Sequence, residues 1–311
     1  MPVIAVTGAT GFVGQTAVGA LRRAFPEAKL RLLIRNPDGR ELPKEFVDCT
    51  VINGTLDAPE VLNGLVQGAD CVVHIAAAIR GSSAVDFERD NICGTRRLVD
   101  AIAAAAPDAH LIQISSLAAR RPDLSWYAAS KRAAEEVVAS NCRRFSILRP
   151  PAVYGPDDPA LAGFWRTLAR GWLIRAGAGQ ARFSLLHVDD LAEAICRLVE
   201  HGPTGEVLPL AGPQPDGGWR WEDLAALAGK TGDRRIRTVA IPGRLLSSGA
   251  ALGLLTSRMA GRRAMLSPGK ARELLHRDWV CDNLDIEKRL KWKPTTRLER
   301  ALATLPGWKN R

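Results

Sequence analysis

Two kinds of hydrophobic pattern alternate along the first half of the chain. Short apolar runs rich in β-branched residues predict strands, and longer segments with apolar positions three or four residues apart predict helices. The predicted strands cover residues 3–7, 30–34, 51–53, 71–75, 111–115 and 145–148. The predicted helices cover residues 11–24, 59–66, 87–106 and 127–140. Strands that alternate with helices in this way build a parallel sheet covered on both faces, so we expect a doubly wound α/β fold.

After residue 150 the spacing of apolar positions becomes less regular. Prolines and glycines are frequent in residues 150–156 and 171–179, which predicts two loops around a short helix. Amphipathic or apolar segments further along predict helices at 188–200, 219–228, 244–258 and 298–304. The change in pattern indicates a second, smaller unit that follows the parallel sheet.

We therefore expect two domains that interleave along the chain. The larger would consist of residues 1–154 and 184–212, and would hold the doubly wound sheet. The smaller, C-terminal α/β domain would consist of residues 155–183 and 213–311.

Composition narrows the class of protein. A chain of 311 residues that is 46% apolar can bury a large core, which excludes a disordered or fibrous protein. The formal charge is +10, but the arginines are spread along the chain without a dense run or interleaved aromatic residues. Nucleic acid is therefore not an expected partner.

Cysteine usage and the chain start bear on the compartment. The six cysteines lie far apart, with no Cys-x-x-Cys pair and no histidine at metal-binding spacing, so we expect a reduced, cytoplasmic protein without a metal site. No signal peptide is apparent, because the chain opens directly into a predicted strand. The longest weakly polar segment, 241–256, contains Pro242 and Arg244 and is too short for a bilayer, so no membrane insertion is expected.

A glycine-rich turn follows the first predicted strand and opens the first predicted helix. It has the spacing Gly8-x-x-Gly11-x-x-Gly14. Glycines at such positions allow a tight turn and a close approach of the backbone to a pyrophosphate, which then lies on free N–H groups of the helix N-terminus. We therefore expect the larger domain to be a Rossmann domain that binds a dinucleotide. The contacts expected from this turn come from Gly8, Thr10, Gly11, Phe12, Val13 and Gly14.

The end of the second predicted strand indicates which dinucleotide is bound. An acidic residue there pairs with the ribose hydroxyl of NAD, whereas an arginine accommodates the 2′-phosphate of NADP. This chain has Arg35, and no Asp or Glu at the strand end. A guanidinium can bind a phosphate through two hydrogen bonds, so NADP(H) is favoured, and NAD(H) stays as the alternative.

One of the two tyrosines of the chain has a lysine four residues later. Tyr127 and Lys131 lie on one face of a predicted helix, where the ammonium can stabilise a tyrosinate and bind the nicotinamide ribose. Upstream, the strand that ends in Ser115 and Ser116 places hydroxyls in the crevice where open α/β sheets bind ligands. Such a hydroxyl can hold a carbonyl or alkoxide oxygen beside the phenol.

Eight segments in the same order give the chain a family resemblance. They are residues 8–14, 54–57, 72–77, 91–95, 115–116, Tyr127 with Lys131, 148–156 and 187–192. With these segments the chain resembles the extended short-chain dehydrogenases/reductases of the NAD(P)-dependent epimerase/dehydratase type over nearly its whole length. The resemblance implies that the smaller domain binds the substrate.

The resemblance also implies roles for individual residues. The catalytic set would be Ser116, Tyr127 and Lys131. The further cofactor contacts would be Arg35, Thr55, Leu56, Ala76, Ala77, Ala78, Ser115, Tyr127, Lys131, Pro150, Ala152 and Val153. The substrate contacts would be Arg80, Ser116, Tyr127 and Tyr154. Asn91 matches a position that mainly supports the sheet and the active-site helix.

One departure from the family bears on the substrate. Members that act on sugar nucleotides commonly have an arginine four residues before the histidine that matches His187, where it binds the diphosphate. This chain has Phe183 in that place. Arg182 is one residue away, but neighbouring residues of a strand point to opposite faces, so we expect it not to compensate. The predicted helix at 244–258 would cover the substrate cleft, and its apolar face would suit a lipid-like or aromatic substrate.

Three functions remain open from the sequence. The favoured one is an NADP(H)-dependent oxidoreductase that interconverts a carbonyl and a secondary alcohol of a small-molecule substrate. The second is a nucleotide-sugar epimerase or dehydratase with tightly bound NAD, which the sugar-enzyme-like segment 282–294 supports. The third is a non-catalytic NADP-binding sensor or assembly protein. A homodimer through the helix that begins at Tyr127 and a monomer are both compatible with the sequence.

Overall fold

The computed structural model describes residues 1–36, 41–177 and 179–308. Its centre is a seven-stranded sheet in the order β11-β6-β5-β4-β1-β2-β3, in which every neighbouring pair runs parallel. The strands are β1 (Val3–Thr7), β2 (Lys29–Ile34), β3 (Thr50–Asn53), β4 (Cys71–His74), β5 (His110–Ile114), β6 (Phe145–Arg149) and β11 (Val207–Pro209). The expected doubly wound α/β fold is confirmed.

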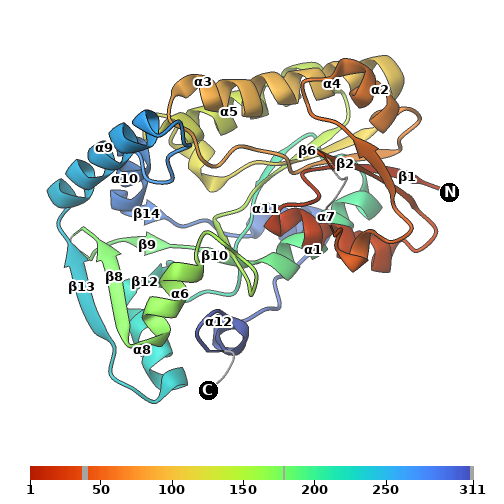
Figure 1. Ribbon diagram of the computed structural model, residues 1–311. Coiled ribbons are helices and arrows are strands. Elements are labelled where there is room, and N and C mark those ends of the chain that lie inside the picture. The colour runs from red at the N-terminus through yellow and green to blue at the C-terminus, as the bar shows by residue number, and fades with distance from the viewer. Residues whose placement is uncertain (37–40, 178, 309–311) are drawn as a thin grey trace.

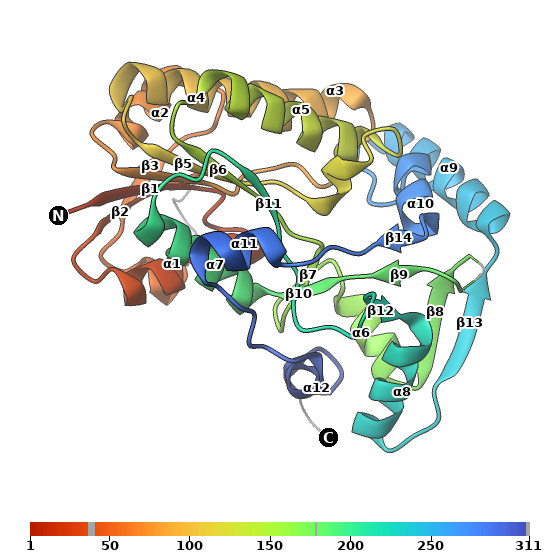
Figure 2. The same ribbon diagram turned by 180° about the vertical axis from the view of Figure 1, so that it is seen from behind.

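Helices cover both faces of this sheet (Figure 1, Figure 2). One face carries α2 (Pro59–Val66), α4 (Gly94–Ala105) and α5 (Trp126–Asn141). The other carries α1 (Phe12–Ala24), α7 (Val188–His201) and α11 (Leu284–Leu290). Each layer buries its own apolar core against the strands, because alternate side chains of a parallel strand point to opposite faces.

The seventh strand, β11, is missing from the sequence expectations. It is only three residues long and ends at Pro209, so it carries no periodic signal. Pairing with β6 gives it an extended conformation, and the carbonyl of Glu206 accepts a hydrogen bond from the amide of Ile147 just before the strand begins. Proline is tolerated because the strand lies at the edge of the sheet.

The helix predicted at 87–106 is interrupted. It begins earlier, with α3 (Ala84–Phe87), which Ser83 caps by accepting a hydrogen bond from the amide of Asp86. A π-helical segment, Glu88–Cys93, then joins α3 to α4. A π-turn contains one more residue than an α-turn, and such turns are frequent at functional sites.

A second set of elements packs at one end of the sheet, where Figure 1 shows them on the left. They are β7 (Ala152–Tyr154), α6 (Ala162–Ala169), β8 (Trp172–Ala176), β9 (Arg182–Phe183), β10 (Leu185–His187), β12 (Trp219–Arg220), α8 (Trp221–Gly232), β13 (Arg237–Ile241), α9 (Gly243–Met259), α10 (Pro268–Leu275), β14 (Asp278–Trp279) and α12 (Leu298–Ala301). Much of this set surrounds a third apolar core, which contains Trp165 and Trp219.

Three expectations for this region need correction. The helix predicted from residue 219 begins at Trp221, because Trp219 and Arg220 pair with β9 as a short strand. The segment predicted as loops contains β8, which pairs with β13 over five residues. Helix α10 was not predicted at all, although Ser267 caps it and Pro268 occupies its first turn, as is typical of helix starts.

Candidate active site

The glycine turn connects β1 to α1 with the geometry that a dinucleotide requires. Gly8 has φ +75°, and a Cβ there would lie 2.5 Å from the amide nitrogen of Ala76. A Cβ on Gly14 would lie 2.0 Å from the carbonyl oxygen of Gly8, so only glycine lets the helix approach the turn. Gly11 begins α1 without a side-chain cap, and no acidic residue lies in the first turn. The amide of Gly11 donates to the carbonyl of Gly8 at 3.1 Å, whereas the first-turn amides of residues 12–14 have no acceptor within the helix and can meet a pyrophosphate.

The other predicted cofactor residues follow the carboxyl ends of neighbouring strands. Arg35 comes directly after β2 and its side chain is exposed. Thr55 and Leu56 follow β3, and the hydroxyl of Thr55 accepts a hydrogen bond from the amide of Asp57 at 3.2 Å. The carboxyl ends of parallel strands meet at one edge of the sheet, so these residues share the edge with the glycine turn.

Asn91, in the π-helical segment, holds the alanine loop that follows β4. Its amide oxygen accepts a hydrogen bond from the Ala78 amide at 2.6 Å, and its amide nitrogen donates to the Ala78 carbonyl and to the hydroxyl of Ser130. The side chain is 2% exposed. Asn91 therefore joins the loop of Ala76, Ala77 and Ala78 to helix α5, which agrees with the supporting role inferred for it.

Ser116, Tyr127 and Lys131 line one wall of a single cavity. The ammonium of Lys131 is buried and donates a hydrogen bond to the carbonyl of Ile114 at 2.7 Å, at the end of β5. Ser116 begins the turn after β5 and interacts through its hydroxyl with the phenol of Tyr127. The structure thus brings the three predicted catalytic side chains to one place.

Burial is the main influence on the pKa values of Tyr127 and Lys131. It raises the pKa of Tyr127 to about 12; the Ser116 hydroxyl opposes this shift and the Glu273 carboxylate adds to it. Burial also lowers the pKa of Lys131 to about 8, which the neighbouring Glu135 partly opposes. The phenol keeps its proton at neutral pH.

Glu135 and Arg149 form a buried ion pair close to Ser115, next to the cavity wall that carries Ser116, Tyr127 and Lys131. Glu135 is 3% exposed and accepts hydrogen bonds from the hydroxyl of Ser115 and from the guanidinium of Arg149, the latter at 2.8 Å. A buried ion pair offsets the cost of desolvation only when its geometry is good and further hydrogen bonds satisfy the charged groups, and this pair meets both conditions. Ser115 therefore points toward the ion pair and positions the strand end, while Ser116 is left to face the phenol.

The cavity itself has a volume of about 710 Å³. It extends from Phe12 and Val13 at the start of α1, past Pro150, Ala152 and Val153, to the elements beyond the sheet. Most of its lining is apolar or aromatic. The aromatic and aliphatic side chains of the distal part include Leu161, Phe164, Trp165, Ile174, Phe183, Trp221, Ile241, Leu246, Met265 and Trp279. An apolar ligand would be desolvated over most of its length.

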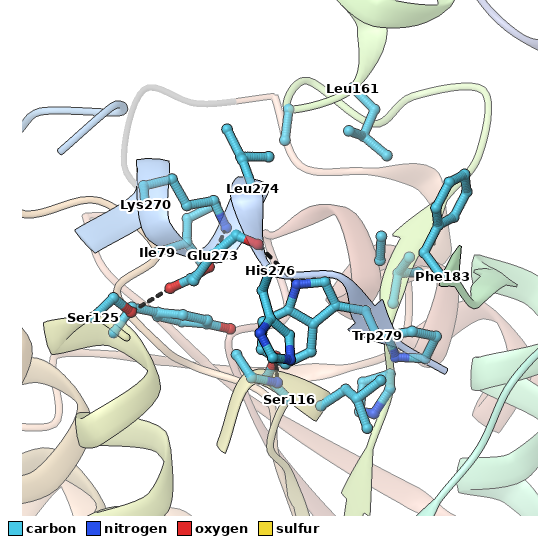
Figure 3. A pocket seen from close by; sticks show the side chains of 18 of the residues that line it. Ile79, Ser116, Ser125, Leu161, Phe183, Lys270, Glu273, Leu274, His276 and Trp279 are labelled. Atoms are coloured by element: carbon cyan, nitrogen blue, oxygen red, sulfur yellow. Dashed lines mark hydrogen bonds and ion pairs between the residues drawn. The ribbon is translucent and has the colours of Figure 1, made fainter. Parts of the chain in front are cut away.

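Sequence reasoning missed the wall that faces Tyr127. It comes from α10 and the segment after it, where Figure 3 shows Lys270, Glu273, His276 and Trp279 around the cavity. The carboxylate of Glu273 accepts hydrogen bonds from Ser125 and, at 2.7 Å, from Lys270. No local motif marks these residues; the serine cap before Pro268 would have located the helix but not its partner.

Three expectations about the substrate end are changed by the geometry. Tyr154 is 2% exposed, packs against Trp165 and His187 and is not part of the cavity lining, so this structure does not support the expected substrate contact. Arg80 is exposed and is not part of the lining. Arg182 does line the cavity, together with Phe183, although the alternation of side chains along a strand predicts only one of them there.

Comparison with known proteins places the chain among enzymes. A profile of the NAD dependent epimerase/dehydratase family matches residues 4–211. The chain is 35% identical over 285 residues to a ceramide reductase of Caulobacter vibrioides, an alignment that covers 89% of this chain and 86% of the relative. It is 29% identical over 223 residues to a 2-alkyl-3-oxoalkanoate reductase of Shewanella oneidensis, covering 61% and 54%.

Solved structures share the fold at lower identity. The UDP-glucuronic acid 4-epimerase of Bacillus cereus, in complex with NAD, superposes with a TM-score of 0.72 at 18% identity and covers 99% of this chain and 98% of its own. The UDP-glucose 4-epimerase of Thermotoga maritima, with UDP-glucose, gives 0.71 at 18% identity, covering the same shares.

Proposed function

The chain belongs to the NAD dependent epimerase/dehydratase family, and from this premise we propose that it is an NADP(H)-dependent reductase of an apolar, lipid-like carbonyl compound. The observation that carries the proposal is the position of Tyr127, Ser116 and Lys131 on the wall of a cavity with a mostly apolar lining. The similarity to a ceramide reductase over 89% of the chain supports it.

The glycine turn and the strand ends fit a dinucleotide. Gly8 and Gly14 clear the backbone for the pyrophosphate, and the exposed Arg35 would pair with a 2′-phosphate. Lys131 donates one of its three N–H groups to Ile114 and makes no other hydrogen bond within the described residues, so two N–H groups could hold ribose hydroxyls. When bound, the nicotinamide would supply the hydride for the reduction.

Side chains of the cavity would position the carbonyl group and supply the proton for the reduction. The Ser116 hydroxyl would hold the carbonyl oxygen, and Tyr127 would donate its proton to that oxygen as the carbon accepts the hydride. The products are a secondary alcohol and a tyrosinate, which regains its proton from solvent. A phenol with a pKa of about 12 is protonated at neutral pH, so the residue is ready to act as an acid.

Phe183 argues against a nucleotide-sugar substrate. It packs against Trp221 with 4.7 Å between ring centroids, in the place where sugar-nucleotide members have their arginine. The second candidate, an epimerase or dehydratase with retained NAD, is favoured by one observation: Arg175 and Arg182 also line the cavity and could meet a diphosphate.

Cofactor binding separates the two candidates. Calorimetry should give exchangeable NADPH binding that weakens at least about tenfold in Arg35→Ala, because a charge-assisted pair to the 2′-phosphate is lost. NADH binding should not change. Arg143→Ala, which removes an exposed arginine elsewhere, is the matched control. If the protein instead retains NAD tightly, and Arg35→Ala does not change this retention, the result would favour the epimerase or dehydratase over the reductase.

Turnover tests the chemistry. A series of aliphatic ketones of increasing chain length should be reduced with a kcat/KM that rises about threefold per added methylene, because each one is desolvated in the cavity. Tyr127→Phe should lower kcat at least about 100-fold and leave NADPH affinity unchanged. Full turnover in Tyr127→Phe would contradict the mechanism.

A further inference from the structure

Almost all of the net positive charge of the chain comes from one segment, which lacks acidic residues. Residues 234–272 contain nine lysines and arginines and no aspartate or glutamate. The rest of the chain has 34 basic and 33 acidic residues and is close to neutral. The segment includes β13, α9 and most of α10, which lie together at the outer end of the molecule (Figure 1, Figure 2).

Helix α9 packs through one narrow face. Of its 17 residues only Ala250 and Leu254 are buried, and α10 is its main neighbour. The opposite face carries apolar side chains that point into solvent. Leu245, Leu252 and Met259 recur every seven residues, so they align along the helix.

The exposure of these side chains is large. Leu245, Leu252, Leu255 and Met259 are 66%, 63%, 56% and 82% exposed. A single exposed leucine is ordinary on a protein surface, but an aligned row on one helix is not. We call these four residues the α9 stripe. Nothing in the described chain covers it.

Cations flank the α9 stripe. Arg244 and Arg258 lie on the helix, and Arg262 and Arg263 lie in the turn that follows it; all four are exposed. Within the described residues Arg263 forms an ion pair with Asp90 at 2.7 Å. Arg258 donates a hydrogen bond to the carbonyl of Ser82. An apolar row with arginines beside it and no acidic residue on the same helix matches the interfacial region of a membrane with anionic headgroups.

The helix that carries the α9 stripe also contributes to the cavity lining. Leu246 of α9 and Met265, Lys270 and Leu274 beyond it belong to the cavity lining. No helix of the described chain is long and apolar enough to cross a bilayer. We propose that the α9 stripe and its arginines dock the protein on the surface of a membrane that contains anionic phospholipids, with the helix lying in the plane of the surface.

Vesicle flotation tests this proposal without any turnover, so its failure is distinguishable from failure of the proposed reductase activity. The full chain should float with vesicles of phosphatidylcholine and phosphatidylglycerol in equal parts, and not with phosphatidylcholine alone. Binding should weaken as salt is raised, because exposed charges are screened. The double variant Leu252→Ser/Met259→Ser should bind at least about tenfold more weakly. Arg244→Gln/Arg262→Gln should lose about tenfold at low salt.

Matched variants on another surface control for general effects. Leu284, on α11, is 73% exposed, and Arg143 is exposed after α5. Leu284→Ser and Arg143→Gln should bind vesicles as the unaltered chain does. Absence of binding, or binding that survives both α9 double variants, would overturn the proposal. A dimer in solution that dissociates in Leu252→Ser/Met259→Ser, without vesicle binding, would also overturn it and assign the stripe to a second copy of the chain.

Discussion

Ser125, which begins helix α5 by accepting a hydrogen bond from the amide of Ala128, donates its own hydroxyl proton to the carboxylate of Glu273, 148 residues further along the chain. This bond joins the helix that carries Tyr127 to α10, on the facing wall of the cavity. It also holds a negative charge close to the phenol, which contributes to the raised pKa of Tyr127.

Glu273→Gln should therefore lower the pKa of Tyr127 below its value of about 12. The amide keeps a hydrogen-bonding oxygen for Ser125 but removes the charge. The chain has only two tyrosines, so ultraviolet titration in a Tyr154→Phe background reports on Tyr127 alone. Oxidation of the alcohol, which needs the tyrosinate, should reach its half-maximal rate at lower pH. Glu27→Gln, at an exposed position, is the control; an unchanged phenol titration in Glu273→Gln would contradict the electrostatic role.

Two glycine-to-alanine variants should have opposite effects on stability. Gly14→Ala forces a Cβ to within 2.0 Å of the Gly8 carbonyl. The backbone must shift to relieve that overlap, so the free energy of unfolding should fall by about 3 kcal/mol and NADPH should bind more weakly. Gly64, in α2, has no atom within 4 Å of the position of an added Cβ. Gly64→Ala should raise the free energy of unfolding by about 1 kcal/mol, because alanine has the higher helix propensity. Urea denaturation measures both, and equal effects would refute the packing argument.

Asn91→Ala should destabilise the fold by about 3 kcal/mol, since it leaves the buried N–H and C=O of Ala78 without partners. Ser130→Ala removes one of the partners of Asn91 and should cost less, about 1 kcal/mol. Denaturant titration of the two variants gives the comparison. A larger loss in Ser130→Ala than in Asn91→Ala would show that the loop after β4 is held by other contacts.

Two buried histidines should make the protein sensitive to acid. Burial lowers the pKa of His74 to about 3 and that of His110 to about 4. Between pH 6.5 and 5 the unfolded chain therefore binds protons that the folded chain does not, so stability falls as pH falls. Each histidine contributes up to about 1.4 kcal/mol per pH unit in that window. Urea midpoints measured across it should show a shallower slope in His110→Gln than in the unaltered chain, and an equal slope in the two would contradict the role of His110.

The regular part of the molecule could be predicted from the sequence because its signals are local. Buried strands such as Val3–Thr7 are continuous apolar runs, and the turn from Gly8 to Gly14 has a spacing that few other structures need. The helix face shared by Tyr127 and Lys131 follows from helical geometry alone. These local features are sufficient to predict one wall of the cavity from the sequence.

The other wall depends on contacts between distant segments. Glu273 lies opposite Tyr127 only because α10 packs beside α9 and bonds to Ser125. Tyr154 was placed against the substrate by family resemblance, but the tertiary packing of Trp165 and His187 buries it. Strand β11 has too few residues to carry a periodic pattern. Sequence patterns report local propensity, and these three positions are decided by packing.

The two walls of the cavity come from segments far apart in the sequence, so the ribosome synthesises one wall well before the other. The glycine turn and the strands of the large sheet, up to Pro209, leave the ribosome well before α10 does. A nascent chain that has reached β11 has every residue expected to bind the dinucleotide, yet it lacks Glu273 and Trp279, which form the wall of the cavity that faces Tyr127. The nascent protein therefore has the residues expected at the cofactor site before it has an enclosed cavity for a substrate.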